Sequence, residues 1–259
     1  MLKILLAVFL LFITCNLQAQ SWEIGGTVGG AGYMGDLNQN NPVKISGGAF
    51  GALVKYNFNG YLSAKLNYLH GTIAGADSTS HNQQSINRNL SFSTPLNELS
   101  GIVEFNFMKY IPSVSDNIYT PFIYLGVGVV GYRPTATYNG QTYDLRSFET
   151  EGQSKPYPNK AISIPYGAGI KYNFAGAWNL IADIGYRNPN TDYLDDVSGK
   201  YPAGLSNPTS VALSDRSGEK NGKYIGMPGT QRGDMRNRDT YLFIGFTISY
   251  TFITPKCYY

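Results

Sequence analysis

The sequence predicts an all-β fold: an eight-stranded antiparallel transmembrane β-barrel of the outer-membrane type, with short periplasmic turns and long extracellular loops. Three observations predict it. Eight segments alternate between bulky apolar residues and small or polar residues with a period of two. The links between these segments alternate between short and long, as in outer-membrane barrels. Charged residues make up only 14% of the chain, against about a quarter in an ordinary soluble domain.

The N-terminus predicts a secretory signal peptide over residues 1–19, which leaves residues 20–259 as a single barrel domain. A basic residue precedes the apolar stretch Ile4–Ile13, which is too short to span a bilayer comfortably. The alternative, lipoprotein cleavage before Cys15, lacks the small residues expected ahead of such a site. After cleavage only Cys257 remains, so no disulfide within the chain is expected.

The strand segments are each 10 to 14 residues long, near the length that a tilted strand needs to cross a bilayer. They are Trp22–Tyr33, Gly47–Phe58, Tyr61–Gly71, Leu96–Met108, Pro121–Tyr132, Ala161–Phe174, Trp178–Arg187 and Thr240–Phe252. In the last of them, Phe246 and Ile248 share one face while Thr247 and Ser249 share the other. We expect small residues to line the narrow lumen and bulky residues to face lipid. Ile102 and Ile181 break this pattern.

Two of the short links are recognisable turns. Asn59-Gly60 is the preferred two-residue hairpin turn, and Ala175-Gly176-Ala177 is nearly as tight. A modest link runs around Pro112 to Asn117. Four long links occupy residues 34–46, 72–95, 133–160 and 188–239. An even number of strands places both termini on the side of the short turns, which we expect to be the periplasm.

Aromatic residues gather near the ends of the predicted strands, where interfacial girdles are expected. The alternative is that aromatic residues simply favour strands. The candidates are Trp22, Tyr33, Tyr56, Phe58, Tyr61, Tyr110, Tyr119, Tyr132, Phe174, Trp178, Tyr186 and Tyr250.

Seven charged residues fall on the inward face of the predicted strands. They are Lys55, Lys65, Glu98, Glu104, Lys171, Asp183 and Arg187. Because buried charges must be paired, we predict a structural salt-bridge network in the lumen. The alternative, a catalytic carboxylate pair of Glu98 and Glu104, requires the two groups to be close. Six positions apart on one strand, they lie about 20 Å from each other, too far for a glycosidase pair.

No catalytic, cofactor or metal site is predicted. The two histidines, His70 and His81, show no nucleophile-and-base pattern. The net charge of +3 has no basic block, which argues against nucleic-acid binding. The run Thr191–Asp196 could bind calcium, but it lacks the regular spacing and distal Glu of a calcium loop. We therefore favour a hydrogen-bonded cluster that orders the loop.

Several short runs, in their order and spacing, carry a resemblance to a known family. They are Gly32–Leu37, Glu104–Phe107, Pro121–Gly126, Thr150–Gln153, Thr191–Ser198, Leu213–Ser217 and Arg232–Asp234. The sequence resembles the PorG family, the outer-membrane β-barrel component of the type IX secretion system of Bacteroidetes. The most specific run is the fifth, which contains the family-like loop motif of Asp192, Tyr193, Asp195 and Asp196. The resemblance covers essentially the whole mature chain.

The resemblance implies a non-catalytic barrel that holds the periplasmic PorK–PorN ring at the outer membrane, in a machine that exports proteins and in gliding species serves motility. Its partners would be outer-membrane lipid and ring proteins, with the segment Pro112–Asn117 and the termini as candidate contacts. Two alternatives stay open. One is a stand-alone barrel whose loops bind an external partner or serve adhesion, and the other is a lipid-modifying barrel enzyme.

Overall fold

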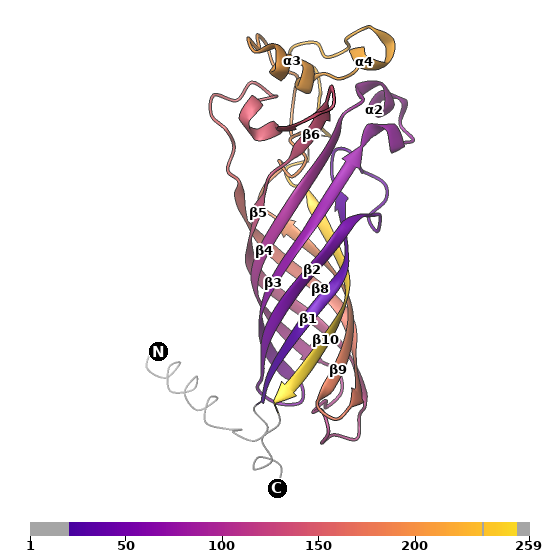
Figure 1. Cartoon of the computed structure of the whole chain (residues 1–259), viewed down its shortest axis with the longest axis vertical. Helices are drawn as coiled ribbons and strands as arrows, with labels where there is room; N and C mark the ends of the chain where they lie inside the picture. Colours follow the sequence, from indigo (N-terminus) through magenta and orange to yellow (C-terminus); the bar gives the residue numbers. More distant parts are fainter. Residues whose placement is uncertain (1–20, 235, 253–259) are drawn as a thin grey trace, which may run out of the picture.

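The computed structural model describes residues 21–234 and 236–252, and shows one closed barrel (Figure 1). The predicted signal peptide and Cys257 lie outside the described residues. The barrel strands are β1 (Ser21–Met34), β2 (Ile45–Asn57), β3 (Leu62–Ala76), β4 (Ser91–Asn106), β5 (Tyr119–Tyr132), β8 (Lys160–Ala175), β9 (Trp178–Pro189) and β10 (Thr240–Phe252).

Each barrel strand pairs antiparallel with the strands before and after it in the chain, and β1 pairs with β10 to close the ring. The β1–β10 ladder runs without interruption from Trp22↔Phe252 to Met34↔Thr240. Closure leaves these strands no unpaired edge, which a lipid environment requires because it supplies no hydrogen bonds. The predicted eight-stranded barrel is therefore confirmed.

Alternation along the strands sorts side chains between lumen and exterior. On β10, Thr247 and Ser249 are buried, while Phe246 and Ile248 are 58% and 54% exposed. The same contrast recurs around the ring, where Val28 on β1 is 64% exposed. A predominantly apolar exterior of this kind is stable only when hydrocarbon covers it. None of the helices in the described chain has the length and apolar character to cross a membrane.

Strands β3 and β4 are longer than the sequence predicted. Their ladder continues through Thr72↔Pro95 to Ala76↔Ser91, so both ends of the predicted link 72–95 are sheet. The polar residues and the proline in these strand ends do not show the alternation by which the other strands were predicted. One face of the extension is nevertheless buried, with Ile73 and Phe92 in the core beneath the cap. Figure 1 shows the two strands rising toward the capping helices.

The long links form a cap over one end of the barrel (Figure 1). Its elements are η1 (Asp77–Thr79), α2 (Gln83–Arg88), β6 (Thr135–Tyr138), β7 (Gln141–Asp144), η2 (Leu145–Phe148), α3 (Pro208–Ser214) and α4 (Gly218–Asn221). The sequence did not predict these short elements. Leu194, Val197 and Leu213 from the cap join Ile73 and Val130 from the barrel in one buried cluster. The cap is thus packed into the mouth of the barrel.

The turn between β2 and β3 differs from the predicted two-residue hairpin. The link spans 58–61, and neither Asn59 nor Gly60 has the positive φ of that turn type. Instead, the Asn59 side chain accepts hydrogen bonds from the amides of Tyr61 and Leu62 at 2.8 and 2.9 Å. Gly60 is required for close approach, because a Cβ there would lie 2.8 Å from Lys109 Cγ.

The link between β4 and β5 closes the turn end of the barrel. Tyr110 and Ile111 are buried, and the Tyr110 amide donates to the Gly60 carbonyl at 2.9 Å. On the far side of the lumen, the Tyr110 hydroxyl donates to Asn179 of β9 at 2.6 Å. The predicted modest turn is therefore a plug, and exposed apolar residues such as Ile118 lie on its outer side.

Candidate functional site

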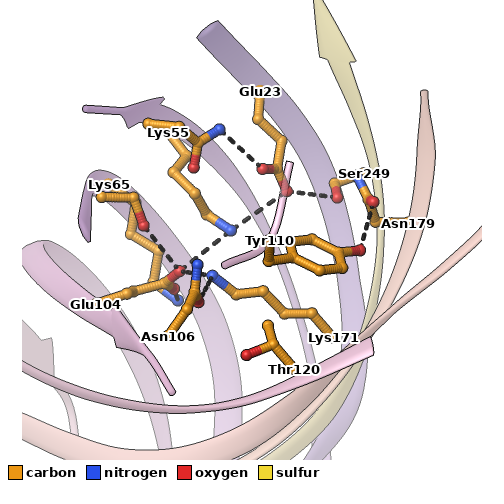
Figure 2. Close-up of polar contacts among 12 residues, drawn as sticks. Glu23, Lys55, Lys65, Glu104, Asn106, Tyr110, Thr120, Lys171, Asn179 and Ser249 are labelled. Atoms are coloured by element: carbon orange, nitrogen blue, oxygen red, sulfur yellow. Dashed lines mark hydrogen bonds and ion pairs between the residues drawn. The ribbon is translucent and has the colours of Figure 1, made fainter. Parts of the chain in front are cut away.

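The lumen near the turn end holds a network of buried ion pairs (Figure 2). Glu104 is its centre: its oxygens lie 2.6 Å from Lys65 Nζ, 2.7 Å from Lys171 Nζ and 3.2 Å from Lys55 Nζ. All four side chains are at most 8% exposed. Lys171 also donates to Asn106 at 2.9 Å. Four strands, β2, β3, β4 and β8, are thereby tied together across the barrel.

Glu23 of β1 belongs to this network, and the sequence prediction missed it. Its Oε1 lies 3.2 Å from Lys55 Nζ and accepts a 2.6 Å hydrogen bond from Ser249 (Figure 2). With Glu23, four lumen acids face four lumen bases, instead of the predicted three against four. The sequence did contain a pattern that could have identified Glu23. In β1 it alternates with Gly25 and Thr27, which places Glu23 on the small-residue face.

A second pair lies farther along the lumen toward the cap. Glu98 lies 3.8 Å from the Arg187 guanidinium and accepts hydrogen bonds from Ser100 and from the Tyr241 hydroxyl. Asp183, the seventh predicted lumen charge, accepts instead from the Tyr124 hydroxyl at 3.1 Å. Glu98 and Glu104 therefore have separate partners, and the geometry offers no shared substrate position between them.

Apolar side chains separate the two groups of charges. Ile102 and Ile181, the two exceptions to the predicted alternation, pack with Phe122 and Tyr124 inside the barrel. An interior hollow beside Glu98 and Tyr241 has a volume of about 20 Å³, enough for about one water molecule. Two groups of charged side chains and the apolar layer between them therefore occupy the lumen.

Several of the predicted girdle residues are exposed near the turn end. Trp22, Phe58 and Trp178 are exposed there, with ring contacts such as Trp22–Tyr56 at 5.0 Å and Trp178–Tyr250 at 5.1 Å. Three of the predicted girdle residues instead point inward and are at most 7% exposed: Tyr33, Tyr110 and Tyr132. They lie at the two ends of the lumen, where their rings pack against the plug and the cap rather than lipid.

The loop motif lies in the cap, close to acids from two other segments. Asp195 and Asp239 accept hydrogen bonds from the Tyr33 hydroxyl. Together with Asp36, they bring three carboxylate oxygens within 4.8 Å of one another, and all three residues are buried. We call Asp36, Asp195 and Asp239 the cap triad. The sequence prediction missed Asp36 and Asp239 as partners of the motif, because they are far from it in the chain and only the folded structure brings them together.

Burial sets the ionisation of the cap triad. Burial is the largest cause of the raised pKa of Asp36; with the added effect of the Asp234 and Asp192 charges, and against the hydrogen bond from the Asp234 amide, this pKa is about 7. Burial also raises the pKa values of Asp195 and Asp239 well above the ordinary range, with further increases from the other triad charges. The triad therefore holds negative charge only at a cost unless a cation or proton compensates it.

The remaining motif residues order the cap by conventional contacts. Asp196 accepts from the hydroxyls of Thr150 at 2.5 Å and Tyr157 at 2.8 Å. Arg232 bonds to the Asp196 carbonyl at 2.7 Å and to Glu151 at 2.9 Å. Two further contacts complete the motif: Asp192 accepts from the Ser198 hydroxyl at 2.8 Å, and Tyr193 stacks on Tyr157 with ring centroids 4.3 Å apart.

The two histidines lie outside the network of lumen charges. His70 lies within β3 rather than at a strand end, on the outward face, where Nδ1 is 2.9 Å from the Asn97 side-chain oxygen. Its ring also contacts Phe50. His81 is exposed between η1 and α2. Neither position resembles a buried base beside a nucleophile.

A closed barrel with an apolar exterior and a polar, filled lumen defines this chain as a membrane-spanning β-barrel of the outer-membrane class. Residues 2–259 match the family described as "Domain of unknown function (DUF6089)", and the chain belongs to that family. No curated protein matches the sequence.

Solved outer-membrane barrels resemble the fold. Surface protein A from Neisseria (NspA) is 10% identical, with a TM-score of 0.45 over 89% of this chain and 97% of its own. OprG from Pseudomonas aeruginosa is 10% identical, with a TM-score of 0.41 over 92% and 99%. The N-terminal barrel of OprF from the same organism is 13% identical, with a TM-score of 0.39 over 91% and 98%. With such values, the class assignment rests on the barrel geometry itself.

Proposed function

We propose that this chain is a non-catalytic outer-membrane subunit of a type IX protein secretion system, which anchors or associates with a periplasmic PorK–PorN-like ring. The resemblance of the sequence to the PorG family supports the choice of machine. The observation that carries the anchoring role is the occupied lumen, which holds the ion pairs around Glu104 and the apolar layer around Ile102. A rigid, closed barrel is suited to holding a partner rather than to transport.

The surface proposed to contact the ring is the plug at the turn end. The described chain begins with β1 and ends with β10 at the end that carries the short turns, and we propose that this end faces the periplasm. Pro112 is buried within the plug, while Val114 and Ile118 are 43% and 55% exposed on it. These side chains are outside the strands, so their apolar surface is not explained by lipid contact.

Affinity purification from detergent-solubilised outer membrane tests this proposal. We expect ring proteins to co-purify with the wild-type barrel, and Val114→Asp with Ile118→Asp to abolish their recovery without changing the folded mobility of the barrel on gels. Tyr224→Asp with Met227→Asp is the matched control, because these residues are 63% and 68% exposed in the cap at the other end. Recovery of the wild-type barrel alone under mild conditions would refute the anchoring role.

A stand-alone barrel that binds an external partner is the second candidate. A surface hollow of about 400 Å³ between α2 and the last loop favours it, with polar lining residues that include Gln84, Arg88 and Gln231. If the double variant in the cap loses a cell-surface interaction while ring proteins are absent from every preparation, this second function replaces the first.

A further inference from the structure

We propose that the cap triad of Asp36, Asp195 and Asp239 is a calcium-binding site that fastens three separate segments of the cap. Asp36 follows β1, Asp195 lies in the loop after β9, and Asp239 precedes β10. The proposal is independent of the secretion role, because it concerns only the cap.

The arrangement of the carboxylates is the first argument. One oxygen of each is held by a backbone amide: Asp36 by Asp234, Asp195 by Val197 at 2.9 Å and Asp239 by Leu194 at 2.9 Å. One ligand oxygen from each residue lies within 4.8 Å of the others. Calcium binds oxygen at about 2.3–2.6 Å, so oxygens on one ion are separated by at most about 5 Å. The spacing is thus that of ligands around one ion.

The second argument is an oxygen without a partner. Asp36 is only 3% exposed, yet its Oδ2 accepts no hydrogen bond among the described residues. The Tyr33 hydroxyl contacts both Asp195 and Asp239 but has a single proton to donate. An orphaned, buried carboxylate oxygen beside two others is costly unless a cation is bound there.

The third argument is the balance of charge. In residues 21–234 and 236–252, no ion pair joins a lysine or arginine to any member of the triad. The nearby arginines have other partners: Arg88 pairs with Asp77 at 2.7 Å, and Arg232 with Glu151 at 2.9 Å. Arg88 does reach Asp36, but it bonds to the carbonyl oxygen at 3.1 Å and not to the carboxylate.

Neighbouring residues fit the same site. Asp192 Oδ1 also lacks a hydrogen-bond partner among the described residues, and the charge of Asp192 acts on Asp36 and Asp239. At Gly35, a Cβ would collide with Asp239 Oδ1 and the Tyr33 hydroxyl, so a side chain there would close the space. An all-oxygen, carboxylate-rich set selects hard cations such as calcium.

Isothermal titration calorimetry of the full barrel, refolded in detergent and freed of metal with a chelator, tests the proposal with calcium chloride alone. We expect one equivalent of calcium to bind, with a dissociation constant of about 0.1–1 mM, as in extracellular calcium modules. Calcium should also slow proteolysis of the cap. Asp195→Asn with Asp239→Asn should weaken binding at least about tenfold, while Asp116→Asn, an exposed acid at the turn end, should leave it unchanged.

If the double variant fails to reach the folded gel mobility, Asp36→Asn carries the same expectation, because its Oδ1 can still accept from Asp234. The absence of heat and of protection up to about 10 mM calcium in the folded wild type, far above the range of such modules, would overturn the proposal and leave shared protons as the compensation. Tighter binding of magnesium than of calcium would overturn the choice of ion.

Discussion

Glu104 is the residue that compensates the buried positive charges of the lumen. It contacts three lysines and is fully buried, so its charge offsets repulsion among them. A buried network of this kind need not stabilise the barrel more than an apolar filling would. Removal of one partner is different, because it leaves the others buried and uncompensated.

We therefore predict that Glu104→Gln destabilises the folded barrel by about 3–5 kcal/mol. Urea-dependent unfolding in lipid vesicles, followed by gel mobility, measures this change. Glu219→Gln is the control: Glu219 pairs with Arg216 at the surface, where a pair contributes at most about 1 kcal/mol. Equal stability of Glu104→Gln and wild type would contradict the network described for the lumen.

Ile102 and Val103 are neighbours in β4 whose side chains lie on opposite faces of the barrel wall. Ile102 is 3% exposed in the lumen, and Val103 is 53% exposed on the exterior. We predict that Ile102→Ala costs about 2–5 kcal/mol, because it leaves a cavity in a packed layer. Val103→Ala should cost much less, since lipid chains fill the space. The same unfolding assay compares them, and a larger loss for Val103→Ala would show that the faces are inverted.

At the scale of elements, the β3–β4 extension joins barrel and cap. Its ladder pairs residues 72–76 with residues 91–95 beyond the predicted strand ends. The Asp77 carboxylate then accepts hydrogen bonds from the Arg88 guanidinium and the Leu90 amide. These bonds connect α2 to the cap end of the extension. The extension is a rigid support for the cap.

Hydrogen–deuterium exchange tests this role. We predict slow exchange for amides in residues 72–76 and 91–94, because the ladder and the buried cluster around Ile73 exclude water. The segment 203–207, which is mostly exposed, serves as the fast-exchanging reference. Exchange of the extension as fast as this reference would mean that the barrel ends near Gly71, as the sequence alone predicted.

At the scale of the whole molecule, side chains cover both ends of this barrel. Tyr110 and Ile111 close the turn end, and the buried cluster around Leu194 and Leu213 closes the cap end. Between them lie the Glu104 network, the apolar layer and the Glu98–Arg187 pair. These layers of described side chains follow one another along the lumen.

We predict that the purified barrel in planar lipid bilayers shows no stepwise ion conductance. A barrel of eight strands has an interior just wide enough for its side chains, and here they fill it. Removal of the plug by replacing residues 108–117 with a short turn should not open a channel, because the Glu104 network remains. Regular conductance steps from the wild-type protein would contradict the closed lumen.

The number of strands, their two faces and most of the lumen charges were predictable from the sequence. These features depend on local periodicity: a residue such as Lys171 faces inward because its neighbours two positions away do. The contacts among the charges were not predictable, since they depend on which strands meet across the lumen. The hydrogen bond from Ser249 to Glu23 requires the β1–β10 closure, whereas the contact of Glu23 with Lys55 follows from the β1–β2 register. The meeting of Asp36, Asp195 and Asp239 likewise follows from how long loops fold over the mouth, where no repeating pattern relates segments far apart in the chain.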